Sequence, residues 1–113
     1  MKELEKKTYI FSVEAIGWAK SMEKINDHSN QTVSFKLVAA NAYKFFSGAV
    51  IAEENKAFAD RLRDSLSAAK EARKLLDEVS TENDELAKQQ KALYEKNDEI
   101  ISELEEIIQK IIY

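Results

Sequence analysis

The chain has 113 residues and a formal net charge of −4, with no proline, no cysteine and only two glycines. A chain of this length fits one domain and buries about two-thirds of its surface on folding. The missing cysteines exclude disulfides, thiolate nucleophiles and cysteine-ligated zinc, and the scarcity of helix breakers predicts an all-α fold.

The first predicted helix covers residues 2–26. Its apolar residues recur every seven positions with others between them, which gives one continuous stripe along the helix. The stripe consists of Leu4, Phe11, Ala15, Trp18, Met22 and Ile25. Ile10, Val13 and Ile16 are expected to widen it. The start of the sequence has no secretion signal, so we expect a cytoplasmic protein.

The segment 26–32, NDHSNQT, consists wholly of turn and capping residues and predicts a linker. Ser29 or Thr32 can cap the helix that follows it. His28 is the only histidine in the sequence. Because it stands alone in the predicted linker, we expect a solvated side chain rather than a catalytic group.

The second predicted helix, residues 33–54, is apolar on almost every side. Between residues 37 and 51 the only exceptions are Asn41, Lys44, Ser47 and Gly48. A lysine at the centre of a membrane span costs roughly 3 kcal/mol. We therefore expect a helix buried in protein rather than in a membrane.

The extra apolar face of this helix predicts a subunit interface. A helix in a bundle needs only one apolar stripe, so a second face calls for a second partner, of which another copy of the chain is the simplest. The alternative is that this helix is the central element, with its alanines permitting close approach. The predicted interface residues are Leu37, Asn41, Phe45, Phe46, Gly48 and Val50.

The two glycines, Gly17 and Gly48, lie within apolar helical runs. Glycine costs roughly 0.5–1 kcal/mol relative to alanine at such positions. We therefore predict that at least one of them marks a tight helix–helix contact, either within the fold or between subunits.

A change of pattern near Asn55 predicts a break, although one bent helix through this point is the alternative. The third predicted helix covers residues 56–79, with a narrow apolar stripe of Phe58, Leu62, Leu66, Ala69, Leu76 and Val79. Ser80 and Thr81 are candidate caps for a fourth helix over residues 82–112. Four helices with short links predict a single antiparallel four-helix-bundle domain, residues 1–113.

Charge is divided unevenly along the chain. Residues 1–76 carry 13 basic and 10 acidic residues, whereas residues 77–113 carry 4 and 11. The favoured interpretation is charge complementarity between helices. The alternative is a nucleic-acid surface on the third helix, made of Arg61, Arg63, Lys70, Arg73 and Lys74. Phosphate binding needs a denser and unopposed basic patch, so we do not expect nucleic acid as a partner.

Four phrases occur in order along the chain: FSVEAIGWAK at 11–20, GAVIAEE at 48–54, KEAR at 70–73 and EEIIQK at 105–110. Through these four segments and their order, the chain resembles a bacterial four-helix-bundle family first noticed in intervening sequences of large-subunit ribosomal RNA genes. The accessory protein of diversity-generating retroelements is a relative. The resemblance implies a non-enzymatic homo-oligomer, with pentameric rings among relatives. In the retroelement branch it implies binding of RNA and a reverse transcriptase.

The sequence lacks the motifs that would support catalysis. A di-iron centre in a bundle needs Glu-x-x-His pairs on two helices, and no phosphate-binding glycine loop is present. We therefore predict a protein without enzymatic activity, metal or cofactor, which acts as a self-associating scaffold or adaptor in protein–protein interaction. The alternatives are an RNA-associated accessory factor, a small acidic inhibitor or decoy, and an engineered helical bundle.

Overall fold

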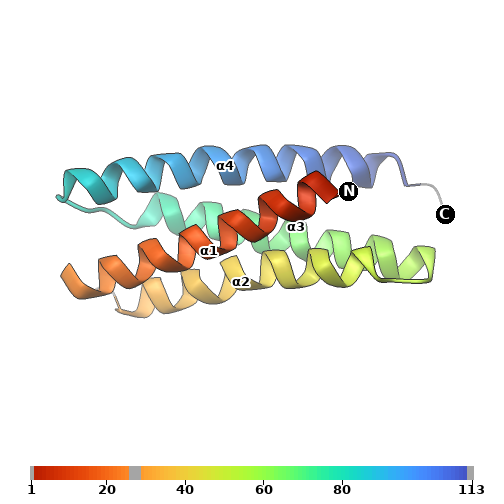
Figure 1. Cartoon of the computed structure of the whole chain (residues 1–113), viewed down its shortest axis with the longest axis horizontal. Coiled ribbons are helices and arrows are strands. Elements are labelled where there is room, and N and C mark those ends of the chain that lie inside the picture. The colour runs from red at the N-terminus through yellow and green to blue at the C-terminus, as the bar shows by residue number, and fades with distance from the viewer. Residues whose placement is uncertain (1, 26–28, 112–113) are drawn as a thin grey trace.

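The computed structural model describes residues 2–25 and 29–111, with only the backbone described for residues 29 and 30 (Figure 1). The helices in this part of the chain are α1 (Lys2–Ile25), α2 (Ser29–Val50), α3 (Asn55–Glu78) and α4 (Asp84–Gln109). No strand occurs among the described residues, which confirms the predicted all-α class. The prediction for His28 falls outside the described residues.

Each helix packs against two others. In the described chain α1 contacts α2 and α4, and α3 contacts the same two helices. Figure 1 shows all four extending along the long axis of a molecule that measures 47 × 20 × 20 Å. This packing is consistent with a bundle. None of the described helices is long and apolar enough to cross a membrane.

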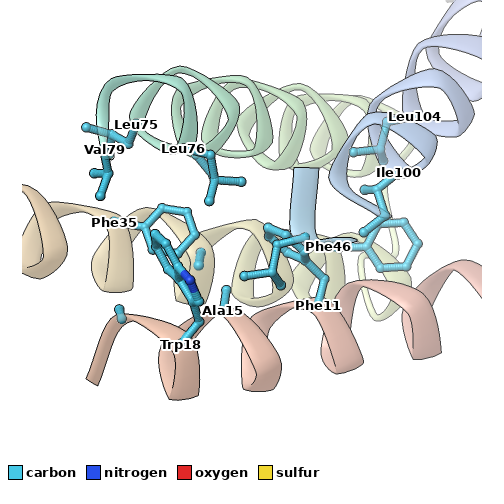
Figure 2. Close-up of a cluster of buried hydrophobic side chains, with 14 of the residues drawn as sticks. Phe11, Ala15, Trp18, Phe35, Phe46, Leu75, Leu76, Val79, Ile100 and Leu104 are labelled. Carbon is cyan, nitrogen blue, oxygen red and sulfur yellow. The ribbon is translucent and has the colours of Figure 1, made fainter. Parts of the chain in front are cut away.

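The core is built from rows of buried residues at alternating spacings of three and four. On α2 the row consists of Thr32, Phe35, Ala39, Ala42, Phe46 and Ala49. This average period of 3.5 residues is the one at which side chains of neighbouring helices interdigitate. Figure 2 shows the rows meeting, with Trp18 of α1 beside Phe35 of α2. The centroids of these two rings lie 5.4 Å apart in an edge-to-face arrangement, which favours aromatic packing.

The predicted stripe on α1 is correct at its centre and wrong at its margins. Phe11 and Trp18 are buried, but Ile25 at the end of α1 is exposed. Ile10 and Val13 are also exposed, so they do not widen the core-facing stripe as predicted. The physical reason is that a helix with two neighbours can bury only the sector between them, and these side chains lie outside it.

Helices α2 and α3 approach each other through small residues. Ala42 of α2 and Ala68 and Ala69 of α3 belong to one buried cluster. The Ser65 hydroxyl of α3 donates a hydrogen bond of 2.6 Å to the carbonyl of Ala42. A side chain as short as serine reaches a neighbouring backbone only where two helices lie close together, so the alanine-rich surface allows this close packing.

A buried amide joins α4 to α3. Asn97 is completely buried, and its Nδ2 donates a hydrogen bond of 2.8 Å to the carbonyl of Ala69. Its Oδ1 is buried without a hydrogen-bond partner. An unsatisfied buried acceptor costs about 1–3 kcal/mol, so this position does not maximise stability.

The helix caps differ from the predicted ones. Asn83 caps α4, because its side chain accepts a hydrogen bond of 3.0 Å from the backbone N–H of Leu86. The predicted caps Ser80 and Thr81 precede this position, and α4 begins at Asp84 rather than at residue 82. Asparagine is among the most favourable capping residues, but position 83 lies inside the span that the apolar pattern assigned to the helix.

The predicted bounds of the second helix are wrong by four residues at each end. The prediction was 33–54, whereas α2 covers Ser29–Val50. Thr32, predicted as a linker or cap residue, lies within the helix and is completely buried. It continues the buried row of α2 one step towards the N-terminus. Tertiary packing therefore extends the helix into polar residues for which the sequence predicted a linker.

The predicted break between the second and third helices lies at residues 51–54. The backbone N–H of Ala52 donates to the carbonyl of Ala49, and α3 starts at Asn55. The alternative of one bent helix is therefore wrong. At the other end, α4 finishes at Gln109 rather than at residue 112, and residue 112 itself lies outside the described part of the chain.

Candidate interaction surfaces

The outer side of α2 presents a second row of residues, which we call the α2 outer row. It consists of Val33, Leu37, Ala40, Lys44 and Ile51, the last of these just beyond the end of the helix. The first four positions follow one another at helical spacings, and Ile51 follows the end of the helix. Leu37 is 62% exposed, Val33 is 56% exposed and Ile51 is 79% exposed. Large apolar side chains with this exposure have lost little contact with water in the single chain.

The predicted interface residues divide between the outside and the inside of the fold. Leu37 and Val50 are exposed, and Asn41 and Gly48 are half-buried. Phe46 is completely buried in the main core, as Figure 2 shows. The fold therefore leaves no surface of Phe46 for a second subunit, and its place in the predicted interface is corrected.

Phe45 is half-buried and packs against the second buried cluster of the fold. That cluster contains Ala42, Ala68 and Ala69, together with Ile101 of α4. Most of the surface of the ring therefore makes contacts within the chain. The sequence could not separate Phe45 and Phe46 from Leu37, because α2 is apolar both on its inner and on its outer side.

The two glycines do not mark tight contacts within the chain, and that part of the prediction is wrong. A Cβ atom added at Gly17 would meet nothing within 4 Å. A Cβ atom at Gly48 would lie 3.7 Å from Cδ of Arg61, which is ordinary van der Waals contact. The close approach of α2 and α3 is instead made by alanine and serine. A contact between subunits at either glycine remains a prediction.

α1 adds apolar residues beside α2. Tyr9 and Val13 are exposed and lie four residues apart, which places them on the same side of α1. The ring of Tyr9 meets the ring of Tyr43 on α2 edge to face, with centroids 5.2 Å apart. The exposed apolar surface therefore extends from α2 onto α1.

One ion pair joins α2 to α1. Lys36 Nζ of α2 lies 2.7 Å from Glu23 Oε1 of α1. The hydrogen bond from Lys36 is the main cause that lowers the pKa of Glu23 below its ordinary value, and burial opposes it. Because Lys36 has this partner, Lys44 is the remaining cation of α2.

The five basic residues of α3 predicted as an alternative nucleic-acid surface do not form one patch. Arg61 and Arg63 are two residues apart, so they point to different sides of the helix, and Arg61 covers Gly48. Lys70 and Arg73 face acids of α4: Lys70 Nζ lies 3.9 Å from Glu105, and an Arg73 nitrogen lies 2.7 Å from Asp98.

The exposed side of α3 also carries acids among its basic residues. Arg63 lies 3.7 Å from Asp60, and Lys74 is exposed near Glu71 and Glu78 in the sequence. The arrangement supports charge complementarity across the fold rather than a surface for phosphates.

The seam between α1 and α4 is closed by further ion pairs. Lys7 Nζ lies 2.7 Å from Glu99 and 3.2 Å from Glu103, and Lys96 lies 2.7 Å from Glu14. The hydrogen bond to Glu99 is the largest cause that raises the pKa of Lys7 above its ordinary value. α1 and α4 thus each supply a lysine that pairs with acids of the other helix.

A groove between α3 and α4 was not predicted. It has a volume of 670 Å³, and we call it the α3–α4 groove. Leu76, Gln90 and Tyr94 are its least exposed lining residues, and Asp77 and Glu95 are exposed beside them. Gln90 Nε2 donates hydrogen bonds of 2.6 Å to the carbonyls of Leu76 and Val79, which satisfies the end of α3.

The described residues contain no group of three or more histidine, cysteine, aspartate or glutamate side chains arranged to hold a metal ion. Comparisons with protein-family models, curated proteins and solved structures give no match for this chain. The resemblance to the ribosomal intervening-sequence family therefore stays a prediction.

Proposed function

We propose that the protein is a non-enzymatic, antiparallel four-helix bundle of the cytoplasm that self-associates through the α2 outer row and acts as a scaffold or adaptor. The observation that carries the proposal is the exposure of Val33, Leu37 and Ile51, whereas the described residues of α3 and α4 include no exposed large apolar side chain. Fully burying one such side chain contributes about 1.5–3 kcal/mol, so a contact that covers the row has a strong driving force.

The antiparallel arrangement is supported by the contacts between α1 and α4. From the start of α1 to its end, the partners on α4 come from progressively earlier positions. The contacts are Lys7 with Glu99 and Glu103, Glu14 with Lys96, and Trp18 with the carbonyl of Leu86. Two helices in contact produce this order when they run in opposite directions.

A second copy of the chain is the partner that best suits the α2 outer row. α2 has no acidic residue, so two copies can meet at this surface without burying a carboxylate. Lys44 is the cation of the row, and its aliphatic stem can cover apolar surface while the ammonium group stays in water. Closed assemblies of identical chains use such surfaces.

The test is the mass of the assembly in solution. Sedimentation velocity of the wild-type chain should show a species larger than one chain, and the resemblance predicts five copies. Leu37→Asp places a charge in the proposed contact and should reduce the mass to that of one chain. Ser67→Asp is the matched control, because Ser67 is exposed on α3, and it should assemble normally.

Two outcomes would contradict the proposal. One is a wild-type chain that sediments as a monomer at high concentration. The other is a Leu37→Asp variant that keeps the wild-type mass. Circular dichroism of both variants should show the helical content of the wild type, because both substituted side chains are exposed.

A further inference from the structure

The α3–α4 groove lies away from the α2 outer row and has a different chemical character. Ten residues of α3 and α4 line it, among which Tyr94 is the half-buried aromatic residue and Leu76 lies buried beneath the surface. Tyr94 is half-buried and also packs against the main core. A fixed aromatic ring at the base of an open groove can accept an apolar side chain without first changing its own conformation.

The rim of the groove is acidic. Four carboxylates line it against a single cation, Lys91. Arg73 neutralises Asp98, and Lys7 neutralises Glu99. The described residues give no such partner to Asp77 or Glu95, so these two carboxylates are available to positive charge from outside the chain.

Asp77 also lies at the C-terminal end of a helix, where a negative charge is unfavourable. It lies in the last turn of α3 with Glu78, and that turn contains no basic residue. The carbonyl end of a helix carries partial negative charge, so an acid placed there is unfavourable. A cation bound at the groove would be attracted by the carboxylates and the helix end together.

We propose that the α3–α4 groove binds a basic amphipathic helix of another protein. Its apolar side chains would contact Tyr94, and its lysines or arginines would face Asp77 and Glu95. This is the helix-in-groove form of peptide recognition, with charge complementarity selecting the partner. The proposal does not depend on self-association, because the two surfaces share no residue.

The test uses a fluorescein-labelled peptide of leucine and lysine, with leucines at helical spacing, and measures fluorescence anisotropy. The wild-type chain should bind it, and added salt should weaken the binding by screening the charges. A second peptide with glutamate in place of lysine should not bind.

A pair of matched variants locates the binding. Asp77→Lys with Glu95→Lys reverses the two available charges and should weaken binding about tenfold, which corresponds to about 1.4 kcal/mol. Glu53→Lys with Glu54→Lys makes the same change in net charge in the α2–α3 connection. This control should bind within about twofold of the wild type.

Three results would overturn the groove as the site. The first is equal loss of binding in both double variants, and the second is no binding by the wild-type chain. The third is loss of peptide binding in Leu37→Asp, which would place the peptide on the α2 outer row. A change of assembly mass in the Asp77→Lys, Glu95→Lys variant would instead assign the groove to a second copy and also contradict the proposal. Failure of self-association alone would leave peptide binding intact.

Discussion

The α1–α2 half and the α3–α4 half of the molecule bury similar inner rows but differ in their outer surfaces. α2 carries two lysines and no acid, whereas the sequence of α4 contains eight acids and three lysines. The inner rows, with Phe35 and Phe46 on one side and Leu76 and Ile100 on the other, hold the helices together. The buried inner rows hold the fold together, and the two halves differ in the charge of their outer surfaces, where we propose that each meets a different partner.

The largest expected difference in the free energy of unfolding is between a substitution in the buried row of α2 and one in the α2 outer row. Phe46→Ala removes a completely buried ring and should lower the free energy of unfolding by about 3–5 kcal/mol. Leu37→Ala should change it by less than about 0.5 kcal/mol in the single chain, because Leu37 is exposed. Urea denaturation of dilute protein measures both. Equal losses would show that the two rows do not differ as described.

A smaller effect, of opposite sign, is expected at Gly17. Gly17→Ala should raise the free energy of unfolding by about 0.5–1 kcal/mol, because the added methyl group meets open space and favours the helix. Gly48→Ala should also stabilise the single chain. Thermal denaturation with sedimentation checks both variants. A Gly48→Ala variant that loses its assembly would identify a tight contact between copies on α2.

The smallest expected effect concerns the ion pair between Glu23 and Lys36. The lowered pKa of Glu23 means that its contribution to stability is present above its ordinary pKa of 4.5 and is lost as the pH falls through the lower value of the folded chain. Glu23→Gln should therefore lower Tm slightly at neutral pH, and the difference should vanish in acid. Glu71→Gln, on the exposed side of α3, is the control. A difference from wild type that persists unchanged in strong acid would contradict the role of the charge.

The stripe of α3 could be predicted from the sequence because its apolar residues stand out from a charged background. Leu62 and Leu76 both belong to the main core. On α2 the same reasoning reached its limit, because a helix that is apolar on every side does not reveal which side faces inward. The adjacent residues Phe45 and Phe46 illustrate this: both were predicted at a subunit interface, and one is completely buried.

The α3–α4 groove could not be predicted because it exists only when two helices meet. Leu76 and Tyr94 are far apart in the sequence, and each reads as part of a separate apolar stripe. Gln90 offered the only signal, since it is a polar residue at a position that faces another helix. Its role at the end of α3 depends on the carbonyls of Leu76 and Val79, whose position the sequence alone does not give.

The buried amide of Asn97 limits how α4 can be aligned on α3. If α4 slid along α3 by one heptad, the amide would face Leu62 or Leu76 instead of Ala69, whose small side chain leaves its carbonyl accessible. The Nδ2 donor would then lose its acceptor while remaining buried, at a cost of about 1–3 kcal/mol. Apolar rows with a seven-residue repeat are nearly indifferent to such a slip, and a single polar side chain removes that indifference. Asn97 therefore sets the register of the two helices.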